Sequence, residues 1–448
     1  MNVLYRSNRL WLIAFLFPAV ISFFWCIYRD VHIERQHPND LRNRIVGSRL
    51  QLDGLSPYFY HWKPADGTRY YDRHNAWPTL QISNITATPF FHQLLYPVAN
   101  LQQRTISKIW LVFEYLVLLA MTGLAIRLSK QAKQKWAVVA TGLLFLHCYA
   151  WRTGIEQGQM YILIPLLAFL FYTFISGKPS LPYAVAAGVI SASLLLIRPN
   201  TLLFFLPFLL LAPRYKLTYK MVFAASATVV FLTAFGSSHS RLYWSDYRKA
   251  LSEHIKSHHD LAPLQTKNPP VPVLEQYEGW NQKQIEQARL FPYHDRTNEQ
   301  GNVFVILNML LHIKIPVWML SLLSIIFMST LCIFFYRTCK QSGEVNVYTI
   351  SLLGFYLYMA SDLFSPVYRA NYNAGQWIFP LLLTASAYSS SIRKIYVAGI
   401  IGGLLLNSMP VYLFPMRHSA GEYLLFASLL GILLFPKPGN DAPGTLLV

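Results

Sequence analysis

The sequence is poor in charged residues and in cysteine. Only 13% of its 448 residues are Asp, Glu, Lys or Arg, whereas soluble globular chains carry about 25%. Its four cysteines are Cys26, Cys148, Cys332 and Cys339. All of them lie in or beside apolar runs, and none has the CxxC spacing of a metal site. The composition therefore excludes a single water-soluble core, and the cysteines exclude a disulfide-rich domain.

The acidic residues are too scattered to build a metal site. Hard cations are bound by clustered carboxylates, and the sequence offers no such cluster. The formal net charge is +18, but the Lys and Arg residues are spread between apolar runs. Nucleic-acid binding would need them on one solvated face. We therefore expect no metal, no cofactor and no nucleic-acid partner.

Long apolar runs dominate the rest of the chain. Hydrophobic residues make up 54% of it, and twelve runs are candidates for spanning helices of roughly 20 residues. They cover about residues 10–28, 107–128, 136–151, 159–176, 182–197, 200–213, 219–236, 315–336, 347–362, 372–389, 394–409 and 421–435. Run 200–213 is too short to cross a bilayer upright. We predict an all-α polytopic membrane protein with a bundle of about twelve transmembrane helices.

Two long polar segments divide these runs. The expected parts are an uncleaved anchor at 1–28, a long segment at 29–106, a transmembrane bundle at 107–236, a second long segment at 237–314, and a C-terminal bundle with a short tail at 315–448. Basic residues of the short loops gather on the side of the N-terminus, which predicts cytoplasmic termini and non-cytoplasmic long segments. Helices lying on the membrane surface are expected at 41–52 and 241–256.

Ionisable side chains near the outer ends of the spans are functional candidates, because they are costly at membrane depth. Arg152, Arg198 and Arg369 end three separate predicted helices and could converge on one anion, since Arg offers a planar donor fork to phosphate oxygens. Each could instead reach up to lipid headgroups. Glu114 and Asp362 lie within spans and would be the ion sites of a transporter.

Several motifs occur in an order that resembles one known family. The string from Asp40 to Tyr58, DLRNRIVGSRLQLDGLSPY, resembles the first outer loop of the DUF2029 or GT87 family of polyprenyl-phosphate-mannose-dependent mannosyltransferases. Further resemblances follow in family order: PFFHQLLYPVANL at 89–101 to a re-entrant Pro-rich piece, GQMY at 158–161 to Gly-Gln-x-Asn, RP at 198–199 to Lys-Pro, NEQG at 298–301 to Asn-Gln-Ser, and SPVYRANY at 365–372 to Ser-Pro-x-x-Trp-x-His-Tyr. The resemblance implies a GT-C-like bundle.

The chain departs from the family pattern at three positions. Asn371 stands where the family usually carries His, Tyr161 where it carries Asn, and Arg198 where it carries Lys. Arg in place of Lys keeps a phosphate contact, whereas Asn in place of His removes a titratable group. Arg369 could supply the charge instead.

The resemblance also implies roles for particular residues. Asp40 would be the catalytic base, because the acceptor hydroxyl must lose a proton as it attacks the sugar; its other reading is a helix N-cap, and Asp30 is the rival carboxylate. The donor phosphate would be bound by Arg198, Arg369 and Arg152. Substrate or structural polar contacts are expected from Gln159, Asn371, Tyr372, Tyr58 and Asn298.

The sequence thus favours a metal-independent, integral-membrane hexosyltransferase. It would move a hexose, by resemblance mannose, from a polyprenyl-phosphate donor to a lipid or glycan acceptor on the non-cytoplasmic face of the inner membrane. Two alternatives stay open: a lipid-linked oligosaccharide ligase or polymerase, and a secondary transporter or flippase. The sequence shows no internal repeat, which weighs against transport because many transporters consist of two related halves.

Overall fold

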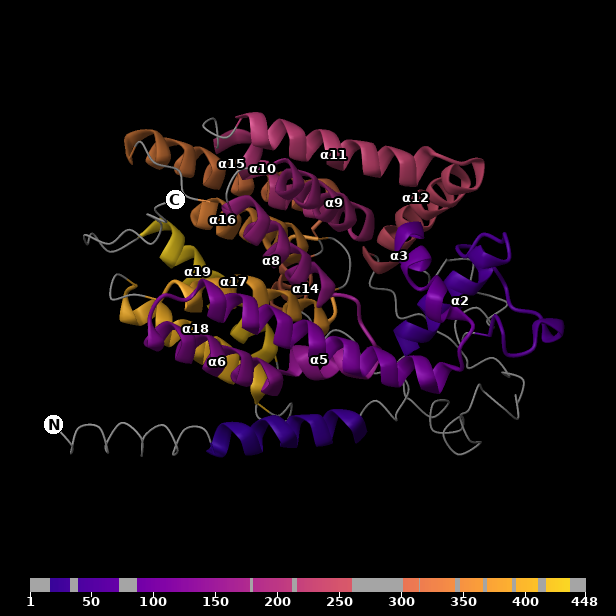
Figure 1. Cartoon of the computed structure of the whole chain (residues 1–448), viewed down its shortest axis with the longest axis horizontal. Helices are drawn as coiled ribbons and strands as arrows, with labels where there is room; N and C mark the ends of the chain where they lie inside the picture. Colours follow the sequence, from indigo (N-terminus) through magenta and orange to yellow (C-terminus); the bar gives the residue numbers. More distant parts are fainter. Residues whose placement is uncertain are drawn as a thin grey trace.

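The computed structural model describes residues 17–32, 39–71, 87–177, 180–211, 216–259, 301–313, 315–342, 347–365, 369–388, 392–409 and 416–435. These residues form helices joined by turns and loops and contain no strand. This confirms the prediction of an all-α protein. The longer helices lie side by side along the long axis of the molecule, and α2, α3 and α12 gather at one end of it (Figure 1).

A helix over residues 17–32 precedes the numbered elements. The first half then contains α2 (Asn39–Leu52), η1 (Pro64–Asp66), α3 (Pro89–Leu94), α4 (Tyr96–Ala99), α5 (Gln103–Leu128), α6 (Ala132–His147), α7 (Tyr149–Gln157), α8 (Leu163–Ser176), α9 (Leu181–Ile197), η2 (Pro199–Thr201), α10 (Leu202–Leu211), α11 (Lys216–Phe235) and α12 (Ser238–His259). The second half contains α14 (Val303–Leu311), α15 (Val317–Ser342), α16 (Val347–Leu363), η5 (Asn371–Trp377), α17 (Ile378–Ser386), α18 (Lys394–Ser408) and α19 (Arg417–Leu434).

Every one of the twelve predicted apolar runs coincides with helix in the described residues. Two stretches, Gln103–Leu128 and Val317–Arg337, are long and apolar enough to cross a membrane as single helices. Others are short, such as α10, whose ten residues span about 15 Å at 1.5 Å per residue. The membrane nature of the chain follows from these helices, and the number of crossings stays a prediction.

The helices divide into enclosed and lipid-facing ones. In α17 every residue is buried, and α16 is buried along almost its whole length. In α5, by contrast, Ile109, Val112, Leu116 and Leu119 are exposed at intervals of three to four residues. That spacing places them on one helix face, which is apolar enough to contact hydrocarbon chains.

Helix α2 is where the structure corrects the sequence analysis. A helix on the membrane surface keeps one face in water, but residues 41–51 of α2 are all buried in protein. Its arginines bind backbone carbonyls: Arg42 donates to Tyr71 and Thr68, and Arg49 donates to Ala99, Arg69 and Leu101. The polar sequence of α2 therefore reflects buried hydrogen bonding to the chain around it, which sequence periodicity does not reveal.

Helix α12 fits its expected surface position better. Its stretch Ser238–Ile255 turns by 91° from Lys220–Phe235 of α11. Tyr243, Tyr247 and Ala250 are buried, while Arg248 and Lys249 are exposed. A helix perpendicular to the bundle with a basic outer face is typical of the membrane interface.

Close packing between α2 and α3 holds the middle of α2 in place. A Cβ atom on Gly47 would lie 2.3 Å from Cε1 of the His92 ring, so only glycine fits there. Burial lowers the pKa of His92 to about 4, which keeps the ring neutral, and its Nδ1 lies 3.0 Å from the Arg44 carbonyl oxygen. The Ser48 hydroxyl donates to the His92 carbonyl at 2.9 Å.

Replacing Gly47 by Ala should therefore lower the free energy of unfolding by about 1–3 kcal/mol, the usual cost of overpacking. Gly123→Ala is the matched control, because a Cβ at Gly123 would meet nothing within 4 Å and Ala is the better helix former by about 1 kcal/mol. Thermal unfolding of the two purified variants measures the difference. Equal melting temperatures would contradict the close α2–α3 contact.

Candidate active site

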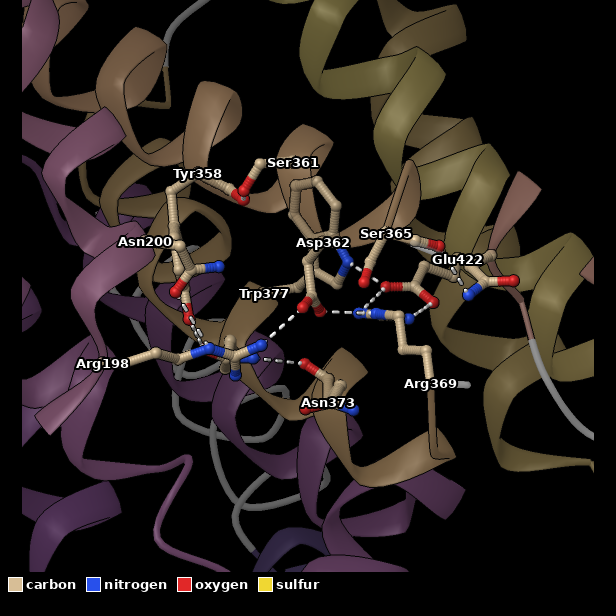
Figure 2. A network of polar contacts seen from close by, with 12 residues as sticks. Arg198, Asn200, Tyr358, Ser361, Asp362, Ser365, Arg369, Asn373, Trp377 and Glu422 are labelled. Carbon is tan, nitrogen blue, oxygen red and sulfur yellow. Dashed lines mark hydrogen bonds and ion pairs between the residues drawn. The ribbon is translucent and has the colours of Figure 1, made fainter. Parts of the chain in front are cut away.

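A network of buried ion pairs joins four helix ends. Arg198 donates to Asp362, and Asp362 also accepts from Nε of Arg369 at 2.6 Å. Arg369 donates in turn to Glu422, with Nη2 2.7 Å from Oε1. Figure 2 shows the four side chains in a line from α9 to α19. Two arginines and two carboxylates thus neutralise one another inside the bundle.

Local sequence explains why these side chains sit at helix ends. Helix α9 ends at Ile197 because Arg198 precedes Pro199 and takes an extended conformation, as residues before proline do. Asp362 lies in the last turn of α16. Glu422 lies in the second turn of α19.

Arg369 is saturated by carboxylates. Its side chain is 3% exposed, and Nε, Nη1 and Nη2 all donate to Asp362 or Glu422. The Trp377 indole also donates to Glu422, at 2.7 Å. Arg369 therefore holds Asp362 and Glu422 together through all three of its side-chain nitrogen atoms, and its expected role at the donor phosphate stays a prediction.

Arg198 is arranged differently from Arg369. Its guanidinium carbon lies 4.6 Å from the centre of the Tyr161 ring and 5.6 Å from that of Tyr358. Nε donates to Asn200 at 3.2 Å and Nη2 donates to Asp362. Within the described part of the chain, Nη1 is buried without a hydrogen-bond partner. Arg198 thus offers its Nη1 as a free donor in a buried environment of low dielectric constant, where an anion would be held strongly.

A second polar centre forms at the start of α2. The Gln159 side chain donates through Nε2 to Oδ2 of Asp40 and accepts, at Oε1, from Arg44 at 2.6 Å. Arg44 also donates to the Gly158 carbonyl at 3.0 Å. Asp40 is half-buried, whereas Gln159 and Arg44 are buried. The structure therefore brings together two of the residues expected at the site, Asp40 and Gln159.

One short segment connects the two centres. Helix α7 ends at Gly158, whose φ of 62° lies in the left-handed region that glycine adopts without strain. The chain then passes Gln159, which contacts Asp40, and two residues later Tyr161, which lies over Arg198. Residues two apart are separated by at most about 7 Å along the backbone. The carboxylate of the expected base and the free guanidinium are thus positioned by the same piece of chain.

Aromatic residues surround this junction. The Tyr161 and Tyr372 rings stack at 5.5 Å. From α12, Tyr247 packs against Tyr58 with ring centres 5.7 Å apart. Burial raises the pKa of Tyr247 to about 12, while the positive charge of Arg198 acts to lower it. The Tyr247 side chain therefore lines the site and is uncharged at neutral pH.

The other expected site residues have varied surroundings. Tyr58 is buried and donates to the Ala87 carbonyl at 2.9 Å, which is a structural role. Arg152 is exposed on α7 and is not part of the ion network. Asn371 and Tyr372 open the helix η5, next to Arg369 in sequence and partly exposed. Asn298 lies outside the described residues.

The rival carboxylate, Asp30, is fully buried and structural. It accepts hydrogen bonds from Arg29 at 2.7 Å, Tyr115 at 2.7 Å and Trp151 at 2.8 Å. Three donors leave it little capacity to accept a substrate proton. The intramembrane Glu114 accepts from Trp110 at 2.8 Å.

Some residues of the site had no predicted role. Glu422 stood out only as a polar residue near a helix end, and the Trp377 indole that binds it carried no sequence signal. Gly301 approaches the same carboxylate, since a Cβ there would lie 3.4 Å from Oε2 of Glu422. The glycine within the NEQG string was the signal that could have indicated this close approach.

Comparison with known proteins agrees with the motif order. Residues 86–268 match the model of glycosyltransferase family 87. No curated protein matches the chain. The matched range contains Gln159, Arg198 and Tyr247, and it lies between Asp40 on one side and the Asp362–Glu422 part of the ion network on the other.

Proposed function

Residues 86–268 match the model of glycosyltransferase family 87, and we propose that the chain is a membrane glycosyltransferase that transfers a hexose, by resemblance mannose, from a polyprenyl-phosphate donor. The acceptor is a lipid or a glycan, and the reaction takes place on the non-cytoplasmic face of the inner membrane. The two termini lie on the cytoplasmic side, as the basic residues of the short loops predict.

One observation carries the proposal. Arg198 is a largely buried guanidinium whose Nη1 has no hydrogen-bond partner among the described residues, and Tyr161, which lies over it, is two residues from the Gln159 that binds Asp40. A cation with a free donor fits a phosphate leaving group. A carboxylate on the same segment fits an attacking hydroxyl, so the sugar would lie between Arg198 and Asp40.

The proposed step is a displacement at the anomeric carbon. The acceptor hydroxyl oxygen forms a bond to that carbon, and the bond between the carbon and the phosphate oxygen breaks. Asp40 takes the hydroxyl proton. The lipid phosphate leaves with the bonding electrons, and its new charge is bound by Arg198. Arginine supplies the positive charge, so the step requires no metal ion.

Arg369 and Glu422 support this arrangement indirectly. Arg369 holds one oxygen of Asp362, and Arg198 donates to the other. The two contacts fix the Asp362 carboxylate, and Asp362 and Asn200 together fix the Arg198 fork. A pre-oriented guanidinium loses less conformational entropy on binding a ligand than a mobile one.

Transport is less well supported. An ion-coupling carboxylate must exchange its ion or proton during each cycle, but Asp362 is held between two arginines within the described structure. The arrangement fits a fixed support for a catalytic site better than an exchanging ion site.

The test is donor binding by Arg198 variants. A charge-assisted hydrogen bond contributes about 1.5–3 kcal/mol, so Arg198→Met should weaken binding of a polyprenyl-phosphate hexose about ten- to a hundredfold. Arg198→Lys should recover only part of the loss, because the planar fork is absent. Thermophoresis of the protein in nanodiscs measures the dissociation constants.

Two controls accompany this test. Arg127→Met alters an exposed arginine in the last turn of α5 and should leave donor binding unchanged, while Arg152→Met should have a much smaller effect than Arg198→Met. Unchanged binding in Arg198→Met would contradict the donor site. Preference for a lipid diphosphate sugar over the monophosphate would favour the ligase alternative.

A further inference from the structure

Gln159 is almost completely enclosed, with 2% of its surface exposed. Its amide spans two charged groups of the same helix: Nε2 donates to Asp40 and Oε1 accepts from Arg44. Asp40 and Arg44 are four residues apart on α2, so their side chains lie on one face of it. Gln159 approaches that face from the segment between α7 and α8.

The chemistry of these partners fixes the direction of the amide. A guanidinium can only donate hydrogen bonds, and an ionised carboxylate can only accept them. The Gln159 oxygen must therefore face Arg44, and its nitrogen must face Asp40. The opposite orientation would place the oxygen against the carboxylate and the NH2 group against the guanidinium.

Arg44 is held in place by contacts at both ends. Its Nη1 donates to the Gly158 carbonyl at 3.0 Å, and its own carbonyl oxygen lies 3.0 Å from Nδ1 of His92. The Asp40 carboxylate accepts the Gln159 hydrogen bond at Oδ2. Its Oδ1 has no hydrogen-bond partner among the described residues.

We propose that Arg44 and Gln159 are positioning residues that orient the Asp40 carboxylate, leaving its Oδ1 to receive the proton of the acceptor hydroxyl. The inference rests on the proposed function, in which Asp40 is the base. It assigns to Gln159 a task on the protein's own base instead of a contact with the substrate.

Other charged or titratable groups on the surrounding elements must be considered. His92 on α3 is neutral and contacts the Arg44 carbonyl, and Tyr96 on α4 donates to Gln51. Glu114 on α5 interacts electrostatically with Arg44. Helix α7 contributes the exposed Arg152 and the half-buried Glu156. Of these, Glu114 and Glu156 are the carboxylates on neighbouring helices whose ionisation could imitate that of Asp40.

The experiment is the pH dependence of turnover in the full-length protein, with a polyprenyl-phosphate hexose as donor. A hydrogen bond donated to a carboxylate favours the charged form. Removing it in Gln159→Leu makes protonation easier, so activity should be lost at a higher pH as the pH falls. We expect the acid limb to move upward by about 1 pH unit, corresponding to a tenfold change in proton affinity, with the plateau at high pH kept within about threefold.

A double variant shows whether Arg44 acts on Asp40 through Gln159 or independently of it. Arg44→Met frees the Gln159 amide and should move the acid limb in the same direction, by less. If Arg44 acts through Gln159, the combined variant should shift the limb no further than Gln159→Leu alone. Additive shifts would show that Arg44 acts separately and would contradict its action through Gln159.

Three controls and one reference variant complete the design. Gln157→Leu changes the glutamine at the end of α7, and Glu114→Gln and Glu156→Gln each remove a competing carboxylate. None of these three variants should move the acid limb. A wild-type pH profile in Gln159→Leu, together with an inactive Asp40→Asn, would contradict the positioning role of Gln159. The proposed function would still hold in that case. Transfer by Asp40→Asn at the wild-type rate would instead remove the base assignment. Should Gln159→Leu not fold, Gln159→Met carries the same test.

Discussion

Replacing Asp40 by Asn should lower turnover by a factor of about 10² to 10⁴, the usual contribution of a general base. Asn has nearly the same shape and still offers an oxygen to Gln159, so the local fold should be preserved. Donor binding should stay within about threefold, because in the proposed site the phosphate is bound by Arg198 and not by Asp40. Steady-state turnover and donor dissociation constants, measured on the same preparation, check both parts.

Asp30→Asn is the matched comparison, since it makes the same chemical change at a structural carboxylate. Asp30 accepts hydrogen bonds from Arg29, Tyr115 and Trp151. Its replacement should therefore lower the melting temperature, and it should reduce the turnover of the folded fraction less than Asp40→Asn does. The two variants thus predict opposite patterns. A fully active Asp40→Asn protein would leave Asp40 only a role at the start of α2.

Replacing Arg369 by Met should destabilise the fold by about 3–5 kcal/mol, the cost of leaving a buried charge without its partner. Glu422 would lose both of its guanidinium contacts and, among the described residues, would keep only the hydrogen bond from the Trp377 indole. Asp362 would still be paired with Arg198. Chemical unfolding in detergent, followed by tryptophan fluorescence, measures the loss.

Two further variants make this prediction specific. Arg369→Met combined with Glu422→Met should regain part of the lost stability, because removing both members of a buried pair is far less costly than removing one. Arg69→Met breaks the pair with Asp53, whose side chains are 41% and 34% exposed, and should cost only about 0–1 kcal/mol. Equal losses in Arg69→Met and Arg369→Met would contradict the importance of burial.

The positions of the helices could be read from the sequence, because long apolar runs are a local signal. Helices α5 and α15 each occupy a predicted run, and a helix satisfies its own backbone in lipid. The left-handed Gly158 and the helix end before Pro199 follow from single residues as well. These features need only neighbours in sequence, so the motif order also sufficed to indicate the glycosyltransferase family.

The surroundings of α2 could not be read in the same way. Its three arginines and its low apolar content resemble a solvated or interfacial helix, yet residues 41–51 are buried. The acceptors that make this burial possible are backbone carbonyls such as those of Tyr71 and Ala99. Every residue has such a carbonyl, so no sequence pattern identifies the ones that a distant guanidinium will use.

The roles of Arg198 and Arg369 likewise depend on tertiary structure. Both follow predicted spans, and the family resemblance implied that each binds the donor phosphate. In the fold, Arg369 meets Glu422, 53 residues away, while Arg198 keeps Nη1 unpaired within the described chain and meets Asp362 across 164 residues. A guanidinium binds carboxylate and phosphate with the same donor fork, so residue type alone cannot distinguish a structural pair from a ligand site. That distinction is made by the packing of α9, α16 and α19, which determines the partner that each guanidinium reaches.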